Sequence, residues 1–395
     1  MTDFLDAPKA SDILAGLEQL VPILGRDASA RERDRVLPHE SVNVLRQSGV
    51  LRLRIPEAVG GAGGTIRQQM EAVMAIASVD SNLAQAVRPH FFFVEELRTQ
   101  GSARTTARWW PELAGGLVVG NALSEAATSR VGQVKSRLEP RGAGWVLNGR
   151  KSYSTGSLYA DRILVSGETA DGEKIMALLP VNRTGIAMQD DWDGMGQRTT
   201  ATGTTTFTDV VIQEDELIEF RSLDEVFTHI GGHRQLFLAA VMAGIAANAS
   251  RELNDYIRDR ARPSAHSLAE TASEDPYVLR VAGAVSSASF GARAAVLAAA
   301  DSLDAAAVQS GDESAAISAA TDVARAQVVI AELVLPATAN LFEAGGASAV
   351  TDSLNLHRHW RNARTVAAHN PIDYKRNAVA NWEINFVQPP RNSYF

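Results

Sequence analysis

A threonine-rich run in the middle of this chain restricts its fold more than any other feature. The run DDWDGMGQRTTATGTTTFTDVVI covers residues 190–212, and the stretch NGRKSYSTG precedes it at residues 148–156. Every second residue from Thr204 to Thr208 is a threonine, and β-branched residues at this density suit a pleated, half-buried surface. Glycines at positions 194, 196 and 203 mark turns or bulges. The run therefore predicts β-structure in the centre of the chain.

Helical patterns lie on both sides of this β-module. Apolar residues recur at helical spacing in SDILAGLEQLVPIL (11–24), and the C-terminal part is rich in alanine, as in ARAAVLAAADSLDAAA (292–307). Alanine permits close approach of helices, which is typical of a four-helix bundle. The predicted fold class is α+β and mostly helical, with an antiparallel β-barrel or sandwich at its centre. The predicted domains are an N-terminal helical domain (1–115), a central β-domain (116–220) and a C-terminal helical bundle (221–395).

Three local signals predict helix ends in the C-terminal part. Asp275 and Pro276 are typical of a helix start, and Asn370 followed by Pro371 suggests a second one. The pair Gly345-Gly346 predicts a helix end, because glycine adopts the left-handed cap conformation without strain.

Composition excludes several classes of function. The net charge is −8 and the pI is near 5.6, which argues against nucleic acid or an anionic membrane as a partner. The absence of cysteine excludes disulfides, thiolate metal sites and cysteine nucleophiles. We predict no metal site, since His357 and His359 have arginines on both sides and lack a nearby carboxylate. No signal peptide and no apolar run of membrane-spanning length is recognised, so a soluble, cytoplasmic protein is expected.

The order of these parts resembles the acyl-CoA dehydrogenase superfamily over essentially the whole chain. The stretches that carry the resemblance are SGVLRLRIPEAVGGAGGT (48–65), NALSEAATS (121–129), NGRKSYSTG (148–156), WDGMGQRTTATGTTTFTDVVI (192–212), LNDYIRDRARP (253–263) and LFEAGGASAV (341–350). The resemblance implies a flavoprotein, usually a homotetramer, with the isoalloxazine ring held between the β-domain and the bundle.

The glutamate base of the dehydrogenases is missing from the positions where the family carries it. Asn370 occupies the usual place with His369 beside it, and His233 occupies the alternative place before Arg234. Residues 129–131 read Ser-Arg-Val where dehydrogenases carry Gly-Ser-Asp to hold the thioester. A dehydrogenase would therefore need a base from elsewhere, and Glu125 is the first candidate.

The segment from Arg361 to Pro371, with Arg-x-x-Arg before His-Asn-Pro, resembles the two-component flavin monooxygenases of this superfamily, such as those that act on dibenzothiophene. That branch receives reduced FMN from a separate flavin reductase and uses O2 to oxygenate a small, mostly apolar substrate, such as a sulfur compound, through a C4a-hydroperoxyflavin. An acyl-CoA dehydrogenase that binds FAD is the alternative. A flavin-free scaffold is a third hypothesis, and the retained flavin motifs argue against it.

The resemblance also implies roles for individual residues. His369 would handle the proton over the flavin, His90 would approach from the N-terminal domain, Asn121 would bond the ring or the oxygen adduct, and Thr155 would bond flavin N5 or O4. We expect Arg260 to reach the flavin phosphate of a neighbouring subunit. The other predicted cofactor-binding residues are Ser124, Tyr153, Ser154, Gly345, Gly346 and Asn370.

Overall fold

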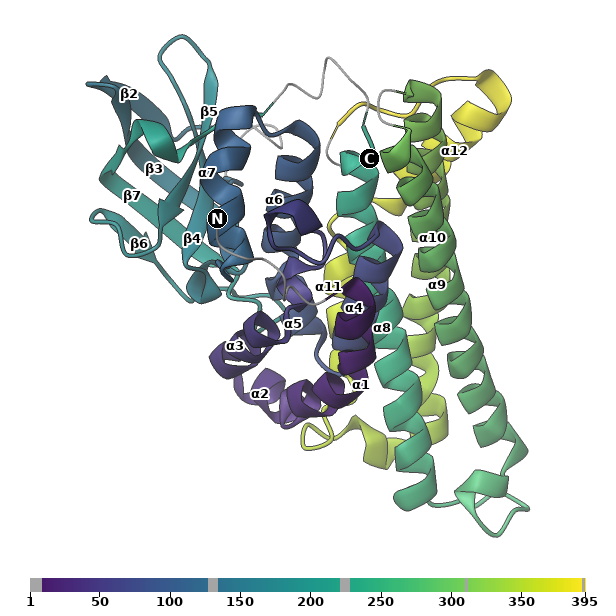
Figure 1. The fold of residues 1–395 in the computed structure, drawn as a ribbon. Coiled ribbons are helices and arrows are strands. Elements are labelled where there is room, and N and C mark those ends of the chain that lie inside the picture. The colour runs from purple at the N-terminus through teal and green to yellow at the C-terminus, as the bar shows by residue number, and fades with distance from the viewer. Residues whose placement is uncertain (1–8, 127–133, 221–227, 310–311, 393–394) are drawn as a thin grey trace.

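The computed structural model describes residues 9–126, 134–220, 228–309, 312–392 and 395. Seven helices make up the N-terminal part of the described chain (Figure 1). They are α1 (Ala10–Gly25), α2 (Ala28–Asp34), α3 (His39–Ser48), α4 (Ile66–Ala77), α5 (Ser81–Ala86), α6 (Arg88–Gln100) and α7 (Ala103–Ala114). Side-chain caps start three of them: Thr65 and Gln68 form a capping box before α4, Asp80 accepts two backbone N–H bonds before α5, and Ser102 caps α7.

The central part forms one eight-stranded sheet. Its strands are β1 (Val119–Ala122), β2 (Arg137–Arg141), β3 (Gly144–Ser154), β4 (Arg162–Glu168), β5 (Lys174–Pro180), β6 (Ile186–Met188), β7 (Gly203–Ile212) and β8 (Leu217–Ile218). The order is β6-β7-β3-β2-β4-β5-β8, with β1 beside β4. The two central motifs are neighbours, because NGRKSYSTG lies on β3 and the threonine run lies on β7.

The sheet is mixed, whereas the sequence pattern predicted an antiparallel one. Both β1 and β2 run parallel to β4. Each parallel pair requires a long crossover between its strands. Residues 123–161 connect β1 to β4. The alternation of residues within one strand does not indicate which strand lies next to it, so the sequence pattern could not predict the parallel pair.

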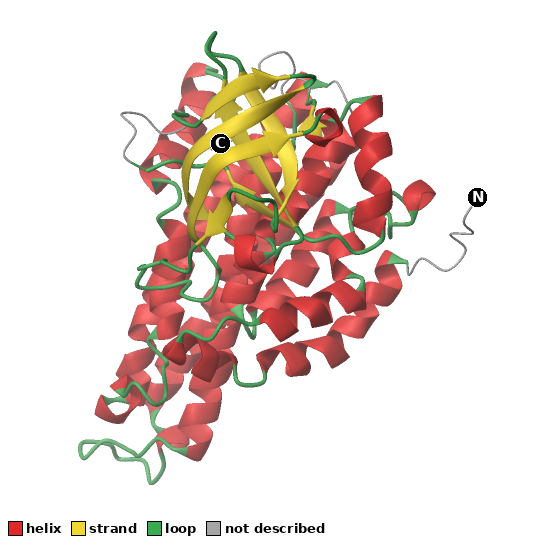
Figure 2. Ribbon diagram, turned by 90° about the vertical axis from the view of Figure 1, so that its left-hand side faces the viewer, coloured by secondary structure: helices red, strands yellow, loops and turns green. Residues whose placement is uncertain are grey.

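The two faces of the sheet bury different neighbours. Leu164 and Leu178 point to one face and pack with Phe93 of α6 and Trp109 of α7. Their strand neighbours, including Val165, point to the other face and pack within the curved sheet itself. This alternation follows the two-residue period of a strand. Figure 2 shows the curved sheet lying across the helices.

Five helices follow the sheet: α8 (Ile230–Asp259), α9 (Pro276–Val308), α10 (Glu313–Gly345), α11 (Arg358–Ala367) and α12 (Ile372–Asn385). The predicted start at Asp275 is confirmed, since its carboxylate accepts bonds from the N–H groups of Tyr277 and Val278. α10 ends at Gly345 as predicted, but Gly346 has φ +60° and ψ −165°, which lies outside the left-handed helical region. The last start is one residue later than predicted, because Pro371 caps α12 and Asn370 lies outside it.

α8 runs through the centre of the molecule, between α4 on one side and α9 and α10 on the other (Figure 1). Gly244 allows the close crossing with α4, because a Cβ there would overlap the side chain of Ala77. Small residues along α8 thus join the bundle to the N-terminal domain in one continuous core.

By length and composition, α8, α9 and α10 are apolar enough to cross a membrane, so the expectation that the chain has no such stretch is wrong. The apolar window of α8 is 78% buried within the protein, but those of α9 and α10 are only 33% and 39% buried. α9 carries two arginines and two aspartates along its length, which are costly in hydrocarbon. The outer faces of α9 and α10 therefore suit contact with protein better than contact with lipid.

Candidate active site

A hydrogen-bonded junction joins the β-domain, the N-terminal domain and the bundle. The amide nitrogen of Gln197, in the loop before β7, donates to Oδ1 of Asn362 on α11 at 2.6 Å. The side-chain amides of Gln197 and Asn362 both donate to Oγ of Ser81 on α5, each at 3.2 Å. Gly196 lets this loop touch α11, because a Cβ there would overlap the carbonyl group of Arg361. These bonds fix the loop of the threonine run against the segment that leads to His369.

Thr155 and Asn121 lie side by side at the edge of this junction. The amide nitrogen of Asn121 on β1 donates to the carbonyl oxygen of Thr155 at 3.3 Å. Oγ1 of Thr155 accepts a bond from Oγ1 of Thr202 at 3.0 Å. Gly156 then turns at φ +72° against the carbonyl oxygen of Ala86, the last residue of α5. The end of β3 is thereby held against the turn between α5 and α6.

Asn121 has a buried acceptor without a donor. Its Oδ1 is inaccessible to solvent and has no hydrogen-bond partner among the described residues. A buried carbonyl oxygen left unpaired is costly. An N–H group of a flat heterocycle such as flavin would satisfy it, so this residue fits the predicted cofactor.

The other predicted flavin contacts on the β-domain differ in accessibility. Tyr153 has φ +59°, a strained value for a residue with a Cβ, and its ring is 54% exposed with its edge toward Trp192. Ser154 is buried and its hydroxyl accepts from Thr205 at 2.9 Å within the sheet. Ser124 is exposed, and its carbonyl accepts from Ser152. Tyr153 is thus free to cover a ligand, while the hydroxyl of Ser154 is occupied.

Glu125 is not a free base. Its carboxylate lies 2.6 Å from Nζ of the fully buried Lys151, and Oγ of Ser136 donates to it at 2.8 Å. Burial raises the pKa of Glu125, but the hydrogen bonds from Lys151 and Ser136 outweigh this effect and lower it overall. Lys151, in the stretch NGRKSYSTG, therefore holds Glu125 as a structural anion.

His90 lies in the N-terminal core rather than facing the bundle. Its Nε2 bonds the carbonyl oxygen of Leu51 at 2.9 Å, and the ring is 1% exposed. Burial lowers the pKa of His90 to about 4, so the ring is neutral at pH 7. Its Nδ1 has no partner among the described residues. The predicted approach of this side chain to the flavin remains a prediction.

The opposite side of α6 faces α8 with aromatic side chains. The ring of Phe92 contacts His233 and Phe237, at centroid distances of 6.1 and 5.8 Å. Phe91 contacts Phe237 at 5.8 Å. Arg88, at the start of α6, lies over the ring of Phe92 with 5.2 Å from Cζ to the centroid. Phe91, Phe92 and Phe237 thus form an aromatic wall between α6 and α8.

His369 follows α11 as a neutral histidine with one free nitrogen. Its Nδ1 lies 3.2 Å from the carbonyl oxygen of Thr365 and 3.1 Å from that of Val366, so Nδ1 carries the proton. Surrounding protein and the charge of Arg88 lower the pKa of His369 to about 4. The side chain is also exposed to solvent, which moderates that shift. At neutral pH, Nε2 can accept a proton, whereas a role as proton donor there requires the charged form of the ring.

Neither of the two family positions for the dehydrogenase base holds a carboxylate. Nδ2 of Asn370 donates to Oε1 of Gln235 at 2.6 Å. His233 is fully buried, with Nε2 2.8 Å from Oε1 of Gln69, and burial lowers its pKa to about 3. The Ser-Arg-Val segment at 129–131 lies outside the described residues.

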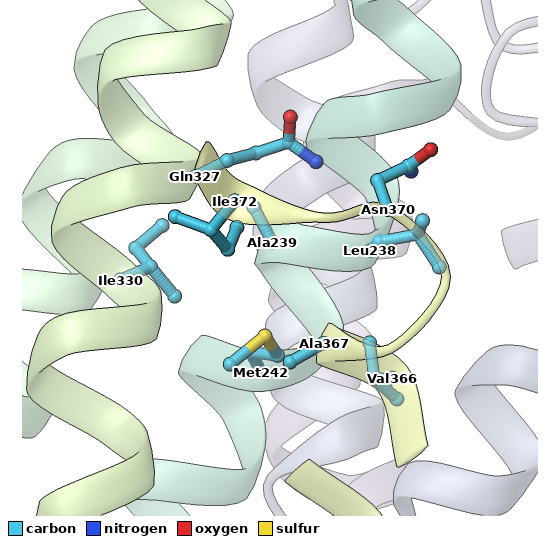
Figure 3. A pocket seen from close by; sticks show the side chains of 9 residues that line it. All are labelled: Leu238, Ala239, Met242, Gln327, Ile330, Val366, Ala367, Asn370 and Ile372. Atoms are coloured by element: carbon cyan, nitrogen blue, oxygen red, sulfur yellow. The ribbon is translucent and has the colours of Figure 1, made fainter. Parts of the chain in front are cut away.

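A small cavity lies beside the loop that carries His369 (Figure 3). It measures about 20 Å³, room for a water molecule. α8, α10 and the loop between α11 and α12 line it with Leu238, Ala239, Met242, Gln327, Ile330, Val366, Ala367, Asn370 and Ile372. Its walls are mostly apolar, with the two side-chain amides of Gln327 and Asn370.

The predicted phosphate-binding residues lie elsewhere in the chain. The hydroxyl of Tyr256 donates to the carbonyl oxygen of Gly345 at 3.2 Å, which joins the C-terminal ends of α8 and α10. These ends lie at the end of the bundle farthest from the sheet (Figure 1). Arg260 is exposed, and no described acidic side chain pairs with it. Gly346 faces open space. Within one chain, this cluster does not meet Thr155 or His369.

Sequence reasoning missed two residues of the site. Thr202 bonds Thr155, and its only signal was its place in the threonine run. The second is Arg88, whose charge lowers the pKa of His369. Its sequence signal was a cation at the first position of a helix, where the helix dipole disfavours positive charge.

Comparison with known proteins agrees with this architecture. Models of the N-terminal, middle and C-terminal domains of acyl-CoA dehydrogenase match residues 22–117, 121–210 and 236–374. The probable FMNH2-dependent monooxygenase SfnC of Pseudomonas putida is 31% identical over 96% of this chain and 97% of that protein.

Solved structures extend this similarity to the fold. Methanesulfinate monooxygenase MsuC of Pseudomonas fluorescens has a TM-score of 0.88 at 29% identity, covering 97% of this chain and 99% of MsuC. TdsC of Paenibacillus sp. A11-2, solved with FMN and indole, has a TM-score of 0.86 at 30% identity, covering 96% of this chain and 99% of TdsC. The chain therefore belongs to the acyl-CoA dehydrogenase family, among its flavin-dependent monooxygenases.

Proposed function

We propose that this enzyme uses reduced FMN and O2 to oxygenate a small organosulfur compound. A separate flavin reductase supplies the reduced FMN. The observation that carries the proposal is that the chain holds both groups the reaction needs. His369 is neutral with a free Nε2, and the buried Oδ1 of Asn121 lacks a donor among the described residues. An oxygenase needs a proton-handling group and a polar contact to the ring in a site closed to water.

Each side of the site has a separate task. Bound reduced FMN supplies two electrons to O2. Asn121 and Thr155 orient the ring from the β-domain, with Thr155 held by Thr202. Nε2 of His369 accepts and returns a proton on the bundle side. The aromatic wall formed by Phe91, Phe92 and Phe237 gives the site an apolar side between α6 and α8.

An acyl-CoA dehydrogenase has less support. Proton abstraction next to a thioester needs a carboxylate with a free lone pair, and Glu125 is committed to Lys151. The other family positions carry an amide and a buried neutral histidine.

We also propose that the enzyme is a cytoplasmic homo-oligomer, most simply a tetramer, whose flavin site takes Arg260 and Gly346 from a neighbouring subunit. Two observations support the oligomer. Arg260 and Gly346 are open to solvent in one chain, and α9 exposes large apolar side chains, including Phe290, which is 78% exposed. A patch of this kind marks a protein interface.

The experiment that tests the oxygenase is ¹⁸O2 labelling with chemically reduced FMN and a panel of sulfides, sulfoxides and sulfinates. One labelled oxygen atom in the product, formed in proportion to FMN oxidised, is the expected result. Oxidation of FMN with H2O2 as the sole product for the whole panel would reject the assignment. A parallel panel of acyl-CoA thioesters with FAD addresses the dehydrogenase directly.

A further inference from the structure

Three side-chain amides connect the loop that carries His369 to two long helices of the bundle. Oε1 of Gln235 on α8 accepts from Nδ2 of Asn370 at 2.6 Å and from Nε2 of Gln327 on α10 at 3.2 Å. Nε2 of Gln327 also lies 3.4 Å from the backbone carbonyl oxygen of Gln235. Figure 3 shows the amide nitrogen of Gln327 turned toward Asn370. We call these three residues the amide bridge.

The backbone contact fixes which way the three amides point. A peptide carbonyl oxygen can only accept, so the nitrogen of the Gln327 amide must face it. Gln235 then has to present its side-chain oxygen to Gln327, and the same oxygen receives Asn370. An amide oxygen has two lone pairs, and each accepts one of these bonds. The side chain of Asn370 is therefore held in one orientation, with its nitrogen toward α8.

The amide bridge lies where polar side chains are costly. The exposed fractions of Gln235 and Gln327 are 4% and 7%, and the residues after Gln235 on α8 are the buried Leu236, Phe237 and Leu238. An apolar side chain at position 235 would avoid the desolvation of an amide. A satisfied polar network in an apolar core can instead specify one arrangement of the chain. Here that arrangement concerns the loop between α11 and α12.

This loop holds His369 between two anchors. On the side of α11, the N–H group of His369 donates to the carbonyl oxygen of Val366. On the other side, Pro371 has no N–H group to donate, and proline restricts the residue before it to extended conformations. The side chain of Asn370 joins this second half of the loop to α8. The position of His369 thus depends on the acceptor that Asn370 finds.

We propose that Gln235 is a positioning residue for His369, which acts through Asn370 and sets where Nε2 of His369 lies in the active site. This proposal rests on the oxygenase function proposed above. Proton transfer needs the transferring group within roughly 2.6–3.2 Å of its partner, and a misplacement of about 1 Å can cost a large part of the rate. Loss of the amide bridge would therefore impair proton handling without removing His369.

The test removes the acceptor and keeps the shape of the side chain. Gln235→Met has a similar length and no hydrogen-bonding oxygen, Gln235→Glu keeps oxygens that can accept from both amides, and Asn370→Leu removes the donor on the loop. The double variant of Gln235→Met with Asn370→Leu completes a mutant cycle. Asn248→Leu is the matched control, because Asn248 is a buried amide on the same helix that bonds Val79 and Arg251.

Two properties are measured for every variant. The first is the product and H2O2 formed per FMN oxidised, with KM and kcat, for the sulfur compound of the panel above that the wild type oxygenates best. The second needs no turnover. Diethyl pyrocarbonate modifies neutral imidazole, and mass spectrometry of the peptide that carries the exposed His369 gives the modification rate before FMN is added. Tm is recorded alongside as the measure of stability.

We expect Gln235→Met to lower the product per FMN oxidised roughly tenfold, to release the difference as H2O2 and to leave KM for the sulfur compound within about twofold. Asn370→Leu should match it, and the double variant should be no worse than either single one, because both changes break the same connection. Gln235→Glu should retain most of the product yield, and Asn248→Leu all of it even with a lower Tm. The modification rate of His369 should rise only where the amide bridge is broken.

Two results would overturn the proposal. A lower Tm in Gln235→Met, with unchanged product yield and unchanged modification of His369, would make the amide bridge a structural feature alone. Additive effects of Gln235→Met and Asn370→Leu would show that the two residues do not act through each other. If the wild type oxygenates no compound of the panel, the proposed oxygenase fails, and the modification rates alone then decide whether Gln235 positions His369.

Discussion

At the scale of single residues, histidines held neutral distinguish this site. His90, His233 and His369 all have lowered pKa values, and burial is the largest cause for each. His369 differs from the other two because it lies on a loop, and its Nε2 is not engaged by a described residue. The chemistry assigned to it depends on that free nitrogen.

His369→Ala should uncouple the reaction. FMN oxidation continues, but product formation falls roughly a hundredfold and H2O2 accumulates, because proton transfer has lost its group. Product and peroxide are quantified per FMN oxidised, with His266→Ala, on an exposed loop, as control. Unchanged product yield in His369→Ala would remove this residue from the mechanism.

The buried histidines also predict how stability depends on pH. The pKa values of His90 and His233 in the folded state are about 4 and about 3, below the value near 6.5 of an unfolded chain. Between pH 6.5 and 4 the unfolded chain therefore binds protons that the folded protein does not. The free energy of unfolding should therefore decrease as the pH is lowered through this window, by at most about 1.4 kcal/mol per pH unit for each histidine.

Urea unfolding from pH 7.5 to 4.5 measures this dependence. His233→Gln should flatten the slope by one histidine's contribution, while the exposed His266→Gln should leave it unchanged. A slope identical in His233→Gln and the wild type would contradict the neutral state of His233.

At the scale of secondary structure, the end of β3 forms the contact between the β-domain and the N-terminal domain. Gly156 takes φ +72° and presses against the carbonyl oxygen of Ala86, whereas Gly142, in the turn before β3, takes φ +61° in open space. Both positions strain a residue with a Cβ, but only Gly156 is also crowded.

Gly142→Ala should therefore lower the free energy of unfolding by only about 1 kcal/mol, because alanine is strained at this positive φ but meets no neighbouring atom. Gly156→Ala should lower the free energy of unfolding by more, about 2–4 kcal/mol. It should also weaken FMN binding, because the crowded Cβ would displace Thr155 from its position near the start of α6. Chemical denaturation and FMN titration of the two variants test this difference. Equal losses in both would show that the contact with Ala86 is unimportant.

At the scale of the whole molecule, the exposed apolar surface of α9 and the exposed Arg260 support the proposed contact with a second subunit. Phe290→Glu on α9 should shift the enzyme to smaller species in light scattering with size-exclusion chromatography, because a carboxylate in an apolar interface is costly. Ile23→Glu on the half-exposed face of α1 is the control. An unchanged mass for Phe290→Glu would exclude this face of α9 from the interface.

The same subunit contact predicts a change in cofactor affinity. Arg260→Ala should weaken FMN binding at protein concentrations where the wild type is oligomeric, since a phosphate-binding guanidinium is lost. Titration of FMN by fluorescence quenching measures the change. An unchanged affinity would place the phosphate elsewhere.

Local patterns in the sequence determined much of the fold. Three patterns depend on residues close along the chain: helix spacing, the Asp275-Pro276 start and the threonine alternation. The helix–sheet–helix order and the presence of both central motifs in one sheet follow from them. The family motifs predicted that Thr155 and Asn121 both contact the flavin, and the structure brings the two residues side by side.

Only the tertiary structure decided the remaining points, because they depend on contacts between residues far apart in sequence. The parallel pairs of β1 and β2 with β4 require a crossover that alternation does not encode. Likewise, whether a titratable residue is free depends on its partners: Glu125 pairs with Lys151, Nε2 of His90 bonds the carbonyl oxygen of Leu51, and Nε of Arg88 has no acceptor among the described residues. The sequence by itself determined the elements and the family, and three-dimensional packing decided which charges remain available for chemistry.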